Sequence, residues 1–262
     1  MSRLYTGSLL VMMAALPACG RQLVEFSLTD AGGAGSTDGG GDAGGTGTGN
    51  PGGAACRLSA VALGSAGGLA VLAGSTVTST GATSVTGDLG VSPGTAVTGF
   101  PPGVLIGARA GDPAAALAMG DLTTAYNDAA GRTLCPISVA GNLGGQTLAP
   151  GLYKSTSSLE ITSGDLTLDA KGDSTSVFIF QMASTLTTTS GRQIILSGGA
   201  RATNVYWQVG SSATLGTGSV FQGTIMADQA ITLGTGATLN GRALARIAGV
   251  SLDTNTILKP AL

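Results

Sequence analysis

Hydrophobic and small polar residues alternate along the last third of the chain, and the alternation recurs at a fixed interval. Residues 207–224 align with 225–242 without a gap, and the string TLGTG occupies the same place in both copies. A third copy at 243–257 contains a one-residue insertion, and an earlier, looser copy places FQM at 180–182 opposite WQV at 207–209. The repeat therefore has a period of 18 residues. In this alignment Thr214 falls on Thr232, and Ser251-Leu252 matches Thr232-Leu233.

A short fixed period in β-prone sequence indicates stacked coils that bury one continuous core. Eighteen residues divide into three strands of about six, which predicts a β-solenoid of triangular cross-section. Period-two alternation turns one set of side chains inward and leaves the other on the surface. The recurring Gly residues suit the corners, where a positive φ or a close backbone approach is needed. The open strand edges at the two ends need covering segments.

One segment departs from the strand pattern and predicts an α-helix over about 112–130. Its sequence is rich in Ala; we expect Asp112 as the N-cap, Pro113 as the first helical residue and Gly131 as the C-cap. Apolar residues recur at helical spacing, so we expect an amphipathic helix that packs lengthwise against one face of the solenoid. These residues are Leu117, Leu122, Ala125, Tyr126 and Ala129.

The N-terminus is typical of an export signal. Arg3 precedes an apolar stretch at 4–15, which is too short to span a membrane. The following LPACG resembles a bacterial lipobox, which predicts a lipoprotein signal peptide over 1–18 and lipidation of Cys19. The alternative is an ordinary cleaved signal with an incidental Cys. Residues 19–55 then form a lipid-bearing tether that is rich in Gly from 31 onward.

We therefore expect a secreted protein. Its only contact with a membrane would be a lipid anchor in the bacterial cell envelope, with the outer membrane preferred. An extracellular location is the alternative. The folded domain is expected over 56–262. Cys56 and Cys135 remain in this domain, and two Cys in a secreted chain favour a disulfide that pins the start of the domain. Two unpaired buried thiols are the alternative.

The composition argues against several kinds of function. The chain has 262 residues, no His, 10% charged residues and a net charge of −2. Without His, catalytic triads that use His and His-ligated metal sites are excluded. The 12 Lys and Arg are spread along the chain, so nucleic-acid binding is not expected. A polysaccharide-cleaving β-helix would need clustered carboxylates. The only dense acidic set reads as turn residues: Asp165, Asp169 and Asp173. We expect no enzyme activity, cofactor or metal.

Four ordered motifs resemble the large microbial ice-binding protein family. They are LGSAGGLAVLAG at 63–74, TGDLGVSPG at 86–94 with TGF at 98–100, LAPGLYK at 148–154 and GATLNGRALA at 236–245. The resemblance extends over about 58–258. It implies an irregular, right-handed β-solenoid of triangular section with one long helix alongside, and adsorption to ice through one flat β-face. No fixed residue set defines that face in the family.

Candidate ice-binding residues are short and uncharged. Thr suits such a face because its β-branch restricts the position of its hydroxyl and methyl groups. An early strand and the segment after 153–154 supply most candidates, and the repeat suggests one further stack. The full set is Ser75, Thr76, Thr78, Thr80, Thr83, Ser155, Thr156, Ser157, Ala183, Gly210, Ala227 and Ala245. The alternative is that these residues only reflect the preference of Thr for strands.

Three TxxT tetrads add to the candidates, at 80–83, 95–98 and 235–238, although the third lies in a repeated corner and is interpreted as structural. Asp228 and Arg246 near the expected face would weaken it if they pointed outward. The expected partner is an ice crystal surface, bound by a monomer. The alternative function is a cell-surface adhesion or envelope-structural module that binds another surface or a glycan.

Overall fold

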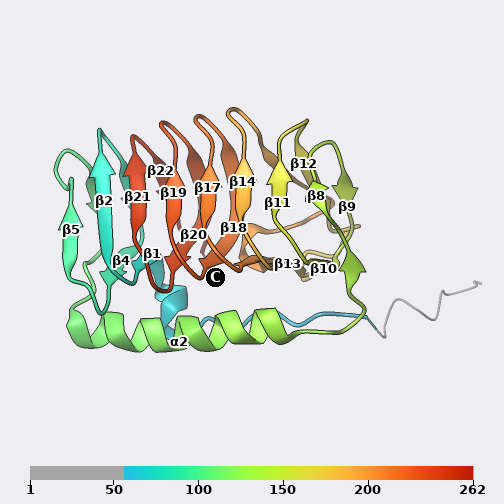
Figure 1. Ribbon diagram of the computed structural model, residues 1–262, viewed down its shortest axis with the longest axis horizontal. Coiled ribbons are helices and arrows are strands. Elements are labelled where there is room, and N and C mark those ends of the chain that lie inside the picture. Colours follow the sequence, from blue (N-terminus) through green and yellow to red (C-terminus); the bar gives the residue numbers. More distant parts are fainter. Residues whose placement is uncertain (1–55, 262) are drawn as a thin grey trace, which may run out of the picture. The chain divides into compact units, whose positions relative to one another are not determined.

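The computed structural model describes residues 56–261. They form a β-solenoid of parallel sheets with one long helix alongside (Figure 1). One sheet has eight strands, which pair in a single row. In spatial order they are β5 (Ala96–Thr98), β2 (Thr76–Thr80), β21 (Val250–Asp253), β19 (Ile231–Leu233), β17 (Ala213–Leu215), β14 (Leu186–Thr188), β11 (Leu159–Ile161) and β8 (Gly141–Asn142).

The other strands form an eleven-stranded and a three-stranded sheet. The path of the larger sheet is β6 (Val104–Ile106), β3 (Ser84–Thr86), β22 (Thr256–Leu258), β20 (Thr238–Ala245), β18 (Val220–Ala227), β16 (Val205–Val209), β13 (Phe178–Met182), β10 (Gly151–Ser155) and β7 (Ile137–Ser138), with β1 (Leu69–Ala73) between β20 and β4 (Asp88–Val91). The smaller sheet contains β15 (Ile194–Ser197), β12 (Leu166–Asp169) and β9 (Thr147–Leu148).

The long strands β18 and β20 belong to two sides of the solenoid. The first half of β20 pairs with β22. The first residue of β18, Val220, forms a bridge with Gln193, which directly precedes β15 of the three-stranded sheet. The second halves of β18 and β20 lie beside β16 and β1. We call the second set, with β4, β7, β10 and β13, the helix-covered side. The first set, with β3, β6, β9, β12 and β15, is the third side.

The strand register confirms the 18-residue repeat. Phe221 pairs with Leu239 and Thr214 with Thr232, as the alignment predicts. The one-residue insertion in the last copy is also confirmed, because Thr232 pairs with Ser251. The right-handed path and the triangular section remain predictions from the sequence.

The order of the coils differs from the order of the chain. The first two coils, β1 to β6, end at one extremity of the solenoid, and the long helix then carries the chain to the opposite extremity (Figure 1). The later coils stack back toward the first until β21 pairs with β2, which sets Val77 beside Val250. The N-terminal coils are therefore held by the C-terminal one, which the repeat alone did not predict.

The interior of the solenoid is filled by the inward side chains of all three sides. Tyr153, Phe180 and Trp207 occupy successive coils at one register position. The rings of Phe180 and Trp207 stack with centroids 3.9 Å apart and planes 7° apart, and Tyr153 and Phe221 flank this pair. Stacked aromatic pairs stabilise a core beyond their buried area, so this ladder fixes the register of the central coils.

The predicted helix is confirmed as α2 (Asp112–Gly131). Its N-cap is Gly111 and not Asp112, which lies in the first turn together with the Pro, and its C-cap is Arg132 and not Gly131, which is the last helical residue. Leu117 is 63% exposed, so it does not belong to the packing face. Small side chains dominate that face and allow close approach to the sheet. The buried residues are Ala115, Ala118, Leu122, Ala125, Tyr126 and Ala129. No helix within 56–261 is long and apolar enough to cross a membrane.

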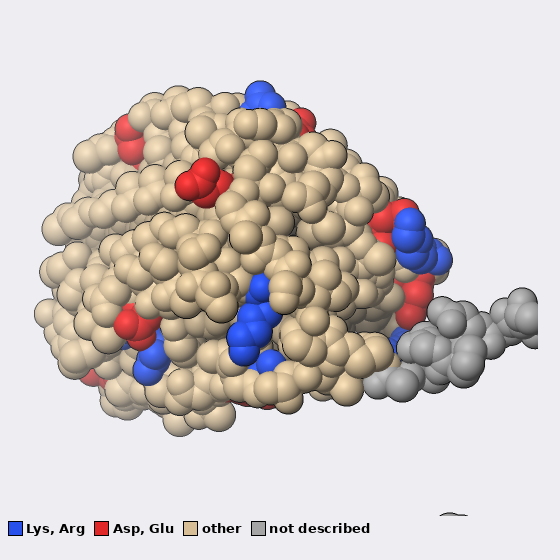
Figure 2. Space-filling view, turned by 45° about the vertical axis from the view of Figure 1, so that its right-hand side comes forward, with Lys and Arg blue, Asp and Glu red and all other residues tan. Residues whose placement is uncertain are grey.

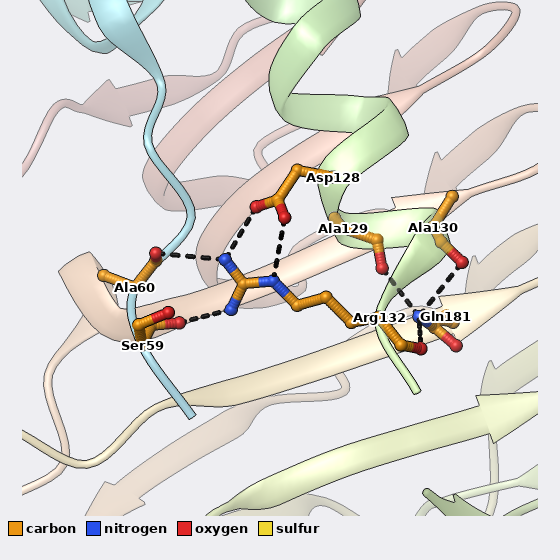
Figure 3. A network of polar contacts seen from close by, with 7 residues as sticks. All are labelled: Ser59, Ala60, Asp128, Ala129, Ala130, Arg132 and Gln181. Carbon is orange, nitrogen blue, oxygen red and sulfur yellow. Dashed lines mark hydrogen bonds and ion pairs between the residues drawn. The ribbon is translucent and has the colours of Figure 1, made fainter. Parts of the chain in front are cut away.

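Two side chains hold the C-terminal end of α2 (Figure 3). The side-chain amide of Gln181, in β13, donates to the carbonyls of Ala129 and Arg132 at 2.6 and 2.9 Å. The guanidinium of Arg132 forms an ion pair with Asp128 at 2.6 Å and donates to the carbonyls of residues 59 and 60. The last carbonyls of a helix have no partner within the helix, so the Gln181 bonds both complete the helix and fix it to β13. The Arg132 bonds tie the same end to residues 59 and 60.

The predicted disulfide between Cys56 and Cys135 is confirmed. It joins the first described residue to the segment that follows α2, across 79 positions of the chain. The expected signal segment 1–18, the lipidation site Cys19 and the whole tether to residue 55 lie outside the described residues.

Gly223 provides a test of the bend in β18. Its φ is +104°, and a Cβ atom there would lie 2.6 Å from the carbonyl oxygen of Val205. Gly223→Ala should therefore lower the free energy of unfolding by about 2–4 kcal/mol, because strain and overpacking add. Gly120→Ala is the control: nothing lies within 4 Å of its Cβ position in α2, and it should raise stability by up to about 1 kcal/mol. Equal effects in thermal denaturation would contradict this account.

Removal of the disulfide tests the anchoring of the domain's first residues. The Cys56→Ser and Cys135→Ser double variant should lose about 2–5 kcal/mol of unfolding free energy, because the bridge closes a long loop in the unfolded chain. Denaturant unfolding of the oxidised and double-variant proteins measures the difference. An unchanged midpoint would show that the bridge contributes no stability.

Candidate functional site

The three sides of the solenoid offer very different surfaces. Helix α2 packs over the helix-covered side and removes it from solvent. The third side carries scattered large hydrophobic residues, and the 3₁₀-helix η2 (Ala202–Asn204) contacts its strands β18 and β20. Its exposed large residues are Val104, Ile106, Ile195 and Leu258. The eight-stranded sheet is therefore the side with a regular and accessible surface.

One register position of the eight-stranded sheet carries a hydroxyl residue in six successive strands. Thr78 pairs with both Thr98 and Ser251, and the series continues without a break from strand to strand. We call the six residues the threonine column: Thr98, Thr78, Ser251, Thr232, Thr214 and Thr187. Adjacent strands lie about 4.8 Å apart, so the column is about 24 Å long. Beyond Thr187 the same position is taken by Glu160 and then by Asn142.

The alternation of each strand explains why these side chains face solvent. In β19, Ile231 and Leu233 are buried, whereas Thr232 between them is exposed. The strand β17 repeats this arrangement around Thr214. The buried neighbours belong to the solenoid core and hold each backbone in place. Within the column, the hydroxyls of Thr78 and Ser251 are 3.4 Å apart.

A carboxylate at the margin of the column is held in a network of hydroxyls. Asp253 accepts hydrogen bonds from Thr235 and Thr254. The hydroxyl of Thr235, with smaller contributions from Thr254 and Thr80, lowers the pKa of Asp253 below its ordinary value. A shallow trough of about 360 Å³ runs between this network and the column residues Thr78, Ser251 and Thr232. Asp253, the one charged residue that lines this trough, is thus held by hydrogen bonds to Thr235 and Thr254.

Charged side chains are sparse over the surface, which Figure 2 shows as broad areas without Lys, Arg, Asp or Glu. Asp228 and Arg246, which were expected near the face, form an ion pair with each other at 2.7 Å. The guanidinium of Arg246 also lies over the ring of Tyr126, 4.5 Å from its centroid. This pair therefore lies at the Tyr126 edge of α2 and outside the column.

The three acidic residues that were considered for an enzyme site each interact with a different basic residue. Asp173 forms an ion pair with Arg57 at 2.9 Å, and Asp169 with Lys171 at 2.9 Å. Asp165 lies 3.7 Å from Arg192. The hydroxyl of Thr175 lowers the pKa of Asp173. The amine of Lys171 lowers the pKa of Asp169. Residues 56–261 contain no group of three or more side chains arranged to hold a metal ion.

Eight of the predicted candidates lie in or beside the eight-stranded sheet or in the connections that lead to it. Thr76, Thr78 and Thr80 lie in β2 of the eight-stranded sheet, and Ser75 precedes them at an exposed position. Four positions are in the connections between the helix-covered side and the eight-stranded sheet, where they are at least partly exposed: Thr156, Ser157, Ala183 and Gly210.

Four candidates are wrong because they are buried. Ala227 and Ala245 have no exposed surface, since they end strands of the helix-covered side. The expected stack assumed that Ala227 lies beside Gly210, but Ala227 pairs with Val209, one residue earlier. Ser155 is 4% exposed at the end of β10. Thr83 is 1% exposed, and its hydroxyl accepts a hydrogen bond from the backbone of Asn255.

Thr98 belongs to the candidate tetrad at 95–98, but four members of the column were missed: Ser251, Thr232, Thr214 and Thr187. The repeat already brought Thr214, Thr232 and Ser251 to one offset, flanked by apolar residues, which was a usable signal. Thr187 lies 27 residues before Thr214, because that coil is longer than the 18-residue repeat. The looser copy, which places FQM at 180–182 opposite WQV at 207–209, has the same offset and was the signal that could have found it.

Comparisons with known proteins agree with this architecture. The profile of the family described as Ice-binding-like matches residues 71–258. An ice-binding protein of Nostoc sp. (strain HG1) is 48% identical over 197 residues, which cover 74% of this chain and 72% of the relative. An ice-binding protein of Flavobacterium frigoris (strain PS1) is 39% identical over 222 residues, with 78% of each chain covered.

Solved structures show the same fold. The crystal structure of an ice-binding protein from an Antarctic biological consortium is 56% identical, with a TM-score of 0.76, and the match covers 77% of this chain and 92% of the other. An ice-binding protein from the Antarctic ascomycete Antarctomyces psychrotrophicus is 40% identical, with a TM-score of 0.74 and coverage of 78% and 100%. The chain therefore belongs to the ice-binding-like family.

Proposed function

We propose that the protein binds ice and that the eight-stranded sheet is its ice-contacting face. The observation that carries this proposal is the register, which sets six hydroxyl residues in line on successive strands. Its relatives named as ice-binding proteins support the same function. The face binds a repeating solid surface, so a repeating array of contacts is what recognition requires.

The side chains of the threonine column suit an ordered water layer. The χ1 angles of its five Thr residues are restricted by the β-branch and by the fixed backbone of the solenoid. Each Thr methyl group then occupies a set place in the water layer while the hydroxyl bonds to it, and Ser251 contributes a hydroxyl alone. Water that is already ordered costs little further entropy, about 0–2 kcal/mol per molecule, when it joins the crystal. The absence of long charged side chains from these six positions leaves that layer undisturbed.

Adsorption would inhibit crystal growth or recrystallisation without any chemical step, or hold the cell to ice. The predicted lipid on Cys19 and the Gly-rich tether support the second role, because they would hold the domain away from a membrane surface. We propose a secreted monomer that is anchored to the cell envelope in this way.

Enlarging one residue of the column tests the face. Thr232→Tyr points into solvent and should not alter the fold, but it should abolish most of the freezing hysteresis because a phenol ring prevents flat contact with ice. Nanolitre osmometry measures the gap. Thr147→Tyr is the matched control, since Thr147 is an exposed strand residue outside the eight-stranded sheet, and it should retain the wild-type gap.

The outcomes separate the face from the function. If both variants retain full hysteresis, ice binding stands and the eight-stranded sheet is the wrong face. If the wild-type protein, folded and with its disulfide intact, shows neither hysteresis nor inhibition of recrystallisation, ice binding is wrong and the adhesion hypothesis is preferred.

Activity should be independent of pH from about pH 5 to about pH 9. The six column residues do not titrate, and the pKa of the neighbouring Asp253 is lowered, so its carboxylate remains charged throughout. Its stabilising bonds are present above its unfolded pKa and are lost only as the pH falls through the lower folded value. Hysteresis measured across this range should be constant. A sigmoidal change would reveal a titrating group in the face.

A further inference from the structure

A second binding feature lies away from the threonine column. An open cavity of about 600 Å³ is bordered by the segment 60–68, by η2 and its flanks, and by strand β20. This volume is within the range of small-molecule sites in proteins. We call the cavity the arginine pocket. Its lining includes Arg201, Arg242, Lys259, Tyr206, Ser174 and Thr203.

The pocket gathers positive charge without a compensating acid. The described residues include ten Lys and Arg, and five of them form ion pairs. Of the other five, three line this one cavity: Arg201, Arg242 and Lys259. None of the described Asp or Glu lines it. In a chain with 10% charged residues, such a convergence of cations is unusual.

Arg242 is the most constrained of the three. It is 1% exposed, and its Nε donates to the carbonyl of Gly67 at 3.0 Å. Its Nη2 has no hydrogen-bond partner among the described residues. A buried guanidinium that lacks an acid and leaves a donor unused is costly to maintain. An anion in the cavity would supply both the charge and the acceptor that are missing.

The neutral lining indicates what the rest of the ligand is like. Burial raises the pKa of Tyr206, so its hydroxyl stays protonated and does not neutralise Arg242. Ser174 and Thr203 add two hydroxyls, and Val61 and Leu63 form an apolar wall. A single water occupies about 30 Å³, so an inorganic ion would fill only a small part of the space. A ligand with an uncharged, hydroxylated body fits the remainder.

We propose that the arginine pocket binds an organic oxyanion of about the size of a monosaccharide, whose carboxylate or phosphate group lies against Arg242, Arg201 and Lys259. This site is independent of ice binding, since its residues lie on other sides of the solenoid from the threonine column.

Calorimetric titration of the purified protein tests the proposal with three probes: glucuronate, inorganic phosphate and glucose. Both anions should bind saturably, because each offers acceptors to the unpaired guanidinium, and glucuronate should bind more tightly because its ring fills the cavity. Glucose, which lacks the charge, should not bind. If phosphate binds and glucuronate does not, the proposal of an organic ligand is wrong. If neither anion binds saturably, the site itself is wrong.

Variants at the pocket locate the binding. Arg201→Ala and Lys259→Ala should each weaken glucuronate binding by roughly tenfold, the usual effect of losing one bond to a charged group. Arg109→Ala is the matched control, since Arg109 is exposed, forms no ion pair with a described residue and lies outside the pocket; it should bind as the wild type does. Equal affinity in all three variants would overturn the site.

Arg242 itself is tested without mutation, because its replacement endangers folding. In a nuclear magnetic resonance titration of the wild-type protein, the Nε–Hε resonance of Arg242 should shift with glucuronate along the calorimetric saturation curve. A stationary resonance would overturn the assignment. The Arg201→Ala protein should retain full freezing hysteresis, so failure of this proposal and failure of ice binding are distinguishable.

Discussion

The parallel pairing of successive coils is the constraint on which the rest of the structure depends. It sets Trp207 beside Phe180 in the interior and, at the same time, Thr214 beside Thr232 on the surface. Inward and outward positions alternate along every strand, so a slip of one residue would expose the core and bury the column. Core packing and the regularity of the outer face are therefore two results of one register. The same coils that stabilise the domain produce the array that ice recognition needs.

Helix α2 resolves a problem that this stacking creates. The first strand, β1, lies within the stack, and the chain runs from it first to one end, so it must return along the whole length before the remaining coils can form. A helix with a small-residue face makes that return in one segment and covers one side of the sheet. Gln181 and Arg132 then fix its far end, and the disulfide holds the first described residues close by. One side is thereby covered and another left open for binding.

The sequence predicted the individual elements better than it predicted which strands pair with each other. The 18-residue repeat and the Ala-rich segment were sufficient for the solenoid and for α2, because both patterns are local. The pairing of Val77 with Val250 was not predictable, since nothing in a local period tells which coil the N-terminal strands join. The face was found only in part for the same reason. Thr76, Thr78 and Thr80 were found from their own strand and Thr98 from its tetrad, whereas Ala227 was misplaced by one residue of register and Thr187, which pairs with Thr214, lies outside the 18-residue repeat.

The central claim is that a surface of this regularity adsorbs to ice. The most direct measurement is the partition of the folded wild-type protein between a slowly growing polycrystalline ice shell and the remaining liquid. The account predicts enrichment in the ice, because adsorbed molecules are overgrown and retained. Exclusion from the ice, to the same extent as a solute with no affinity for it, would contradict the claim.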